Sequence, residues 1–270
     1  TQKIQDRHAE VNVLVSLGLA HDLIGNYGTA IKLHLKGLEI AREIKDRRGE
    51  GTIFGNLGSV YLATKNYDQA IDCQKKRLYV AQEIADLRGE ATALGNLGAI
   101  YDAIKDYKQA IDYYCQSLSI MQEIEERWSE ANLLGNLGLA YYNLGDSDKA
   151  IDFQVKSLSL MDEVEDVSGK LWVLGCLGNS NSALKKYDQA VDYYKERLIL
   201  SRSTGNKIQE IDTLLKIGIT LRKNENYSKS LQYLQIALDT FSDDNYNTEL
   251  RSKAFKALAE TYQRLDQYQL

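Results

Sequence analysis

The chain has 270 residues, of which 44% are hydrophobic and 26% are charged, and it contains no proline. This composition is typical of a folded, soluble protein and argues against intrinsic disorder. The net charge of −5 argues against a nucleic-acid partner, because nucleic-acid binders present a basic stripe to the phosphate backbone. No apolar run approaches the roughly 20 residues of a membrane span, and no signal peptide opens the sequence. We therefore expect a cytoplasmic protein without membrane contact.

Three columns of residues recur along the chain at a step of 40, as from Leu17 to Leu57 (57 − 17 = 40). The first column is an aliphatic residue followed by glycine, at Leu17, Leu57, Leu97, Leu137, Leu177 and Ile217. The second is a small residue, at Ala30, Ala70, Ala110, Ala150, Ala190 and Ser230. The third is mostly tyrosine, at Tyr27, Tyr67, Tyr107, Ser147, Tyr187 and Tyr227. Such a period predicts a stack of like units, each burying its apolar face against its neighbours.

The expected units follow in chain order as one array. Residues 1–9 resemble the segment before Glu50, so we expect them to be the end of a preceding repeat's second helix. Six full repeats and a partial seventh are then expected, at 10–49, 50–89, 90–129, 130–169, 170–209, 210–250 and 251–270.

Residues 50–89 illustrate the predicted structure of one unit. Apolar and small residues recur with helical spacing over 50–63, which predicts a first helix, and a second helix is predicted from Tyr67. Gly89 is expected to end that second helix in the left-handed conformation. Gly58 and Ala70 are small enough for the two helices to approach closely, which compensates for glycine's propensity cost of about 1 kcal/mol.

These residues resemble the tetratricopeptide signature, with Leu57-Gly58, Tyr61, Tyr67, Ala70-Ile71 and Leu78 repeated across the chain. The 40-residue unit resembles the arrays of Pins-type scaffolds, kinesin light chains and many bacterial regulators. The Gly-Asn-Leu-Gly phrases at 55–58, 95–98 and 135–138 are especially similar to the Pins type. The resemblance implies an all-α, right-handed superhelical solenoid of antiparallel helix pairs that binds peptides or partner proteins. The fifth repeat departs from the pattern with Cys176 and Asn181, and the sixth with Leu215-Lys216.

In the family, the first helix of each repeat lines a concave groove. The resemblance places Asn56, Asn96 and Asn136 in this groove, each directly before a Leu-Gly pair. An asparagine amide both donates and accepts, so a ladder of three would pair with the backbone of an extended peptide. The preceding Gly55, Gly95 and Gly135 have no side chain and would let the peptide backbone approach. Alternatively, the glycines ease packing between repeats, and the asparagines only form hydrogen bonds with the adjacent helix.

Other groove positions are expected to select the partner. These positions are mostly neutral and include Ser59, Asp102, Leu139, Tyr142, Asn143, Trp172 and Asn179. Tyr142 and Trp172 are candidate hydrophobic anchors, because aromatic residues dominate interface energetics. Lys216, Arg222 and Lys223 form a basic stretch that suits acidic side chains or a terminal carboxylate, and a solvated helix face is an equal alternative.

Catalytic chemistry has little support in the sequence. The three cysteines are far apart and are expected to be buried free thiols, and His21 and His34 fall in packing columns. No Cys/His cluster has metal-ligand spacing, so we expect neither a metal nor a cofactor. Asp243 and Asp244 lie in a polar run that is expected to be a solvated loop rather than an acid/base pair.

We therefore predict a non-catalytic interaction module that binds an extended peptide or partner-protein segment and acts as a scaffold or regulatory adaptor. The alternative is the sensory or substrate-recruiting part of a larger protease, kinase or nucleotide-driven switch. A third hypothesis is end-to-end self-association through uncapped ends that expose Phe255 and Leu258.

Overall fold

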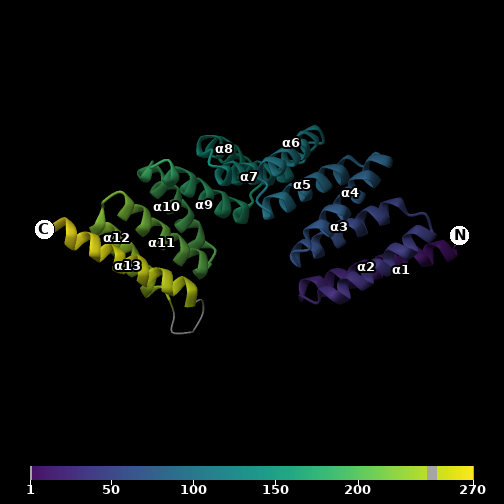
Figure 1. Cartoon of the computed structure of the whole chain (residues 1–270), viewed down its shortest axis with the longest axis horizontal. Coiled ribbons are helices and arrows are strands. Elements are labelled where there is room, and N and C mark those ends of the chain that lie inside the picture. The colour runs from purple at the N-terminus through teal and green to yellow at the C-terminus, as the bar shows by residue number, and fades with distance from the viewer. Residues whose placement is uncertain (1, 242–247, 270) are drawn as a thin grey trace. The chain divides into compact units, whose positions relative to one another are not determined.

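The computed structural model describes residues 2–241 and 248–269, and within these ranges every regular element is an α-helix (Figure 1). The predicted acidic pair Asp243 and Asp244 lies outside the described residues. The helices are α1 Gln2–Leu23, α2 Tyr27–Glu43, α3 Arg47–Ala63, α4 Tyr67–Glu83, α5 Leu87–Ala103, α6 Tyr107–Glu123, α7 Arg127–Leu144, α8 Ser147–Glu163, α9 Val167–Ala183, α10 Tyr187–Ser203, α11 Lys207–Lys223, α12 Tyr227–Asp239 and α13 Thr248–Gln269.

The chain divides into two compact units, Thr1–Leu133 and Leu134–Leu270, which we call the N-unit and the C-unit. Within each unit a helix packs mainly against the helices that precede and follow it in the sequence, as α3 does against α4 and α10 against α9. The first helices start at a step of 40, from Arg47 to Leu87 and from Val167 to Lys207. The expected all-α solenoid of antiparallel helix pairs is therefore confirmed.

The repeated columns form the core. Within the N-unit, Leu57 and Leu97 are almost completely buried, as are Leu137 and Leu177 in the C-unit. The alanine column is fully buried from Ala30 to Ala190, at Ala30, Ala70, Ala110, Ala150 and Ala190. At the start of the chain the pattern fails: Leu17 is 47% exposed, because α1 packs mainly against one helix, α2.

The glycine of each Leu-Gly pair allows the two helices of a repeat to approach closely. A Cβ atom on Gly138 would lie 3.0 Å from the carbonyl oxygen of Ala150 and 2.6 Å from Cγ of Gln154. A Cβ atom on Gly98 would lie 2.6 Å from the ring of Tyr114. Side chains at these positions would push the helices apart, so the expected role of the glycine and alanine columns is confirmed.

Gly89 does not end a helix, contrary to the expectation. The left-handed residue after α4 is Ala85, with φ +54°, and Gly89 lies in the first turn of α5. Its N–H donates to Oδ1 of Asp86 at 3.0 Å, which makes Asp86 the N-cap of α5. Asp46 and Asp166 cap α3 and α9 in the same way. A Cβ there would lie 2.6 Å from Oδ2 of Asp86, so glycine leaves room for the capping carboxylate in this position.

Both ends of the described chain are helical. Residues 2–9 continue α1 as one helix to Leu23, and α13 runs without a break from Thr248 to Gln269. The repeat boundaries themselves remain a sequence prediction.

Substituting Gly89 by alanine is expected to destabilise the protein by about 1 kcal/mol, because the added methyl group displaces the capping carboxylate of Asp86. Gly28, in the first turn of α2, provides the matched control, since nothing lies within 4 Å of a Cβ placed there. Gly28→Ala should leave stability unchanged or raise it. Urea unfolding of both variants checks this, and equal effects of the two substitutions would contradict the capping role.

His34 gives the fold a predicted pH dependence. Its ring is fully buried against Gly18, and neither ring nitrogen has a hydrogen-bond partner among the described residues. Burial lowers the pKa of His34 below its ordinary value, and the nearby Asp22 carboxylate opposes this shift only in part.

Because the unfolded chain binds a proton at His34 more readily than the folded one, stability should fall as the pH drops below about 6.5. The variant His34→Gln places there the residue that Gln74 supplies at the equivalent position. We expect it to lose less free energy of unfolding than the wild type between neutral and acidic pH. Urea titrations at several pH values measure this, and parallel pH profiles would rule out the role of His34.

Candidate peptide-binding surface

The three predicted ladder residues are half-buried on first helices. Asn56 and Asn96 lie on α3 and α5 in the N-unit, and Asn136 lies on α7 in the C-unit. Each directly precedes a core leucine, which fixes its backbone. No hydrogen bond links these three amides to any other residue that the structure describes, and Nδ2 of Asn56 is buried without a partner. The alternative in which they merely bond an adjacent helix is therefore not observed.

The glycines before these asparagines do not leave open space for a ligand. A Cβ on Gly55 would meet the guanidinium of Arg77, and one on Gly95 would lie 3.3 Å from Oγ of Ser117. Trp172 and other side chains fill the space over Gly135 in the same way. The hypothesis that a ligand backbone approaches these glycines is wrong: they accommodate side chains of the chain itself.

In the C-unit, several predicted residues meet in one pocket of about 320 Å³, which we call the Lys216 pocket. Tyr142 of α7, Asn179 of α9, and Lys216 and Lys223 of α11 all line it. Ser182 and Tyr194 complete its polar lining. First helices of three successive repeats thus contribute aromatic, amide and ammonium groups to a single concave site.

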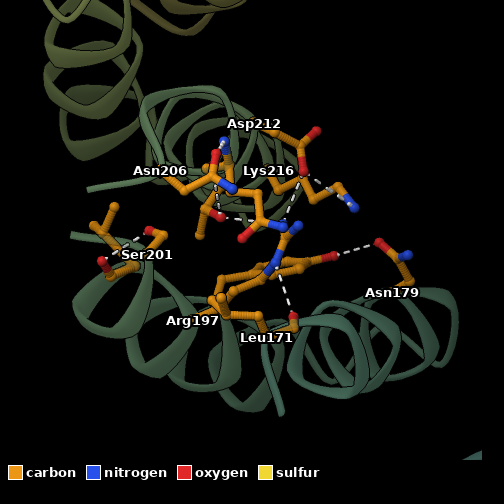
Figure 2. Close-up of polar contacts among 11 residues, drawn as sticks. Leu171, Asn179, Arg197, Ser201, Asn206, Asp212 and Lys216 are labelled. Carbon is orange, nitrogen blue, oxygen red and sulfur yellow. Dashed lines mark hydrogen bonds and ion pairs between the residues drawn. The ribbon is translucent and has the colours of Figure 1, made fainter. Parts of the chain in front are cut away.

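A polar network lies beside this pocket (Figure 2). The buried Tyr194 donates its hydroxyl hydrogen to Oδ1 of Asn179 at 2.7 Å, and burial raises the pKa of that hydroxyl. The ammonium of Lys216 lies 5.9 Å from the centre of the Tyr194 ring and 3.7 Å from a carboxylate oxygen of Asp212. The charge of Lys216 is therefore oriented by an aromatic face and a carboxylate.

Sequence reasoning missed the centre of this network, Arg197 of α10. Its Nε donates to the carbonyl oxygen of Leu171 at 3.1 Å, and its Nη1 donates to Asp212 at 2.8 Å and to Thr213 at 3.0 Å (Figure 2). The Arg197 side chain is only 11% exposed, so these contacts compensate for its desolvation. A signal was available, because this column is small at Ser117, Ser157 and Ala237 and is arginine only at Arg77 and Arg197.

The remaining predicted residues are dispersed. Ser59 is exposed, and its hydroxyl donates to the carbonyl oxygen of Gly55 at 3.2 Å. Asp102 is half-buried near Tyr114, Leu139 is half-buried, and Asn143 is exposed. Trp172 is 36% exposed although part of its ring covers Gly135, so an apolar face remains available at the surface.

The expected basic stretch divides between two environments. Lys216 and Lys223 line the Lys216 pocket, whereas Arg222 points to α13, where it pairs with Glu260 and donates to the carbonyl oxygen of Ala257 at 3.3 Å. Its guanidinium thus joins two helices of the C-unit. Of the three cations, Lys223 is the most exposed.

The cysteines are free, and two of the three are buried as expected. Burial raises the pKa of Cys73 and Cys176 to about 11, although Lys216 and Arg197 partly oppose the shift at Cys176. Cys115 is exposed, contrary to expectation, because its position on the second helix faces away from the core. No group of three or more histidine, cysteine or acidic residues in the described chain has the geometry of a metal site.

No helix in the described part of the chain has both the length and the apolar character that crossing a bilayer demands.

Comparison with known families then identifies the repeat. A family model described as tetratricopeptide repeat matches residues 49–123 and 129–202, more than half of the chain. The chain belongs to the tetratricopeptide repeat family. No curated protein sequence matches this tetratricopeptide repeat chain.

Solved structures share the fold at low sequence identity. The apo form of RapI is 14% identical with a TM-score of 0.71, and the match covers 96% of this chain and 99% of that one. Aspartyl phosphate phosphatase F from Bacillus subtilis is 15% identical with a TM-score of 0.74, covering 97% of this chain and 72% of that one. A STAND protein with a tetratricopeptide repeat sensor from Pyrococcus horikoshii is 15% identical with a TM-score of 0.77. The match covers 98% of this chain and 44% of that one.

Substituting Asp212 by alanine should destabilise the protein by about 1.5–3 kcal/mol, because it removes the only carboxylate that hydrogen-bonds Arg197 among the described residues. The lower end is expected, since the Asp212 side chain is 35% exposed. The control is Asp192→Ala, which breaks an exposed 3.3 Å pair with Lys195 and should cost less than about 0.5 kcal/mol. Urea unfolding measures both, and equal losses would show that the Arg197 network contributes little.

Proposed function

We propose that this protein is a non-catalytic interaction module that binds an extended peptide or a partner-protein segment along its first helices. The observation that carries the proposal is the unbonded side-chain amides of Asn56 and Asn96 on successive first helices of the N-unit, with Asn136 at the equivalent position in the C-unit. Tetratricopeptide repeats typically serve as scaffolds for protein partners, and family membership supports the same function here.

The chemistry of the surface suits a peptide. An asparagine amide offers one acceptor and two donors, so it pairs with a peptide backbone whatever the side chains. In the C-unit, the Lys216 pocket adds an aromatic wall from Tyr142 and ammonium groups from Lys216 and Lys223. Such a pocket favours a peptide side chain that has an apolar stem and an acidic end. Trp172 supplies a further apolar anchor.

The comparisons support this function at the level of the fold. One similar structure is a Rap protein complexed with competence and sporulation factor, at 14% identity and a TM-score of 0.66. The proposal includes a cytoplasmic location, because free thiols such as those of the three cysteines are typical of a reducing compartment.

A second candidate function is the sensory part of a larger protein. The STAND protein from Pyrococcus horikoshii carries a tetratricopeptide repeat sensor, and this chain matches 44% of it. Sequencing the complete open reading frame tests this alternative: an attached nucleotide-binding or catalytic domain would favour the sensory role.

Self-association remains a third prediction. Phe255 is 53% exposed on α13, whereas Leu258 packs against the core of the C-unit and offers less surface. Light scattering over a range of concentrations tests it.

The test of peptide binding uses a random peptide library displayed on phage and selected on the wild-type protein. Enriched peptides should bind the wild type, and their affinity should fall at least about tenfold on the triple variant Asn56→Ala, Asn96→Ala, Asn136→Ala. The reason is that each lost amide removes backbone hydrogen bonds from the complex. Binding is measured by fluorescence polarisation of the labelled synthetic peptides.

A second triple variant controls for general effects of alanine. Gln69→Ala, Gln116→Ala and Gln235→Ala change exposed amides on second helices and should leave peptide affinity unchanged. Both variants should retain the wild-type helicity and melting temperature. The proposal fails when no peptide is enriched, or when the asparagine variant binds as tightly as the control variant.

A further inference from the structure

Two arginines occupy equivalent positions in different units: Arg77 on α4 and Arg197 on α10 (197 − 77 = 120, three steps of 40). Each lies over the equivalent glycine of its own first helix. A Cβ on Gly55 would meet Arg77, and a Cβ on Gly175 would lie 3.2 Å from Nε of Arg197. The two guanidinium groups therefore occupy the same place within their repeats.

In the C-unit this place includes a carboxylate. Asp212, fifteen residues after Arg197, accepts a hydrogen bond from its Nη1 at 2.8 Å. Planar guanidinium and carboxylate groups match each other well, and a desolvated arginine is stabilised by such a partner.

In the N-unit the carboxylate is missing. The residue equivalent to Asp212 is Thr92 (212 − 120 = 92), whose hydroxyl donates to the carbonyl oxygen of Arg88 at 2.7 Å. No described residue forms a hydrogen bond or ion pair with the Arg77 side chain. Burial lowers the pKa of Arg77, and attraction to Asp86 opposes the shift only in part. Arg77 is thus a half-buried cation that lacks the contact its counterpart makes.

Arg77 lines a pocket of about 190 Å³ between α3, α4 and α5. Its charged lining also includes Arg48, Arg88 and Asp86, so cations outnumber carboxylates three to one. Arg88 pairs with Glu126, which leaves Arg48 and Arg77 opposite the single carboxylate of Asp86, and that carboxylate also caps α5 through the N–H of Gly89. Two cations against one carboxylate give the pocket a net positive charge.

The pocket lies on the same helix faces as the asparagines. Thr52 and Thr92 line it, and each stands four residues before Asn56 or Asn96 on the same helix. Residues four apart are neighbours on one face of an α-helix. A peptide that engaged these asparagines would pass beside Arg77.

We propose that this pocket binds the carboxylate of an aspartate or glutamate side chain from a partner peptide. The incoming carboxylate pairs with Arg77 as Asp212 pairs with Arg197 in the C-unit. The partner's identity as a peptide rests on the proposed function, whereas the preference of the pocket for a carboxylate does not.

The first experiment places the missing carboxylate on the chain itself. Thr92→Asp should raise the melting temperature by about 2–4 °C relative to the near-isosteric Thr92→Asn. This difference should disappear when Arg77 is replaced by glutamine, because the new aspartate then has no guanidinium to pair with. A difference that persists without Arg77 would overturn the proposed pairing.

The second experiment uses a small carboxylate probe on the full chain. N-acetyl-aspartate N-methylamide is titrated to millimolar concentrations while the side-chain Nε–H signals of the arginines are followed by NMR. The signal of Arg77, assigned from Arg77→Lys, should shift with this probe and not with the matching asparagine amide. In Thr92→Asp the signal should no longer respond, because the site is filled.

The C-unit provides the matched control for the titration. The Arg197 signal should be unaffected in the wild type and should respond to the probe in Asp212→Thr, which recreates the N-unit arrangement. Absence of any Arg77 response, or tighter binding of inorganic phosphate than of the aspartate probe, would overturn the assignment. Failure of the phage selection alone would refute peptide binding and leave these two experiments intact.

Discussion

In every described repeat, the backbone of the first helix lies directly against a side chain of the second helix. The glycine of the Leu-Gly pair makes this contact possible, and the side chain opposite it varies along the chain: His34, Gln74, Tyr114, Gln154, Tyr194 and Leu234. An imidazole, an amide, a phenol and an aliphatic group all fit because glycine contributes no atoms of its own to the gap. The fold thus tolerates chemical variation at a buried position while the spacing of the helices is retained.

This tolerance connects the core to the surface. Tyr194 fills the gap over Gly178 and still reaches Asn179 with its hydroxyl, and Gln154 fills the gap over Gly138 and accepts a hydrogen bond from Ser180 at 2.9 Å. Residues chosen for packing in the second helix therefore orient polar groups of first helices. Because each repeat packs mainly on its neighbours, such a change alters the surface locally without disturbing distant repeats.

The sequence predicted most of the fold because one period encodes it six times. The prediction for Gly89 was wrong because glycine is common both after the end of a helix and in the first turn of one. Only the N-cap Asp86, three residues earlier, indicates that Gly89 lies in a first turn. The repeat pattern assigned the asparagines to the first helices, as the structure has them. It could not show whether the space over Gly55 is open to a ligand. The side chain that fills it, Arg77, lies 22 residues later on another helix (77 − 55 = 22). Contacts between helices depend on rotamers, which the period does not specify.

Residues that recur from repeat to repeat and residues that occur once in a unit contribute differently to the recognition of a peptide. A peptide group that pairs with Asn56 would pair equally well with Asn96 after sliding by one repeat, because the two amides are alike. Register must then come from features that occur once in a unit, such as Arg77 with its unfilled partner position or Lys216 beside Tyr194. A register that brings no carboxylate to Arg77 leaves this half-buried cation unpaired. The penalty discriminates between registers more strongly than another neutral hydrogen bond. Affinity from the repeated amides and specificity from the exceptional charges are therefore separable properties of this surface.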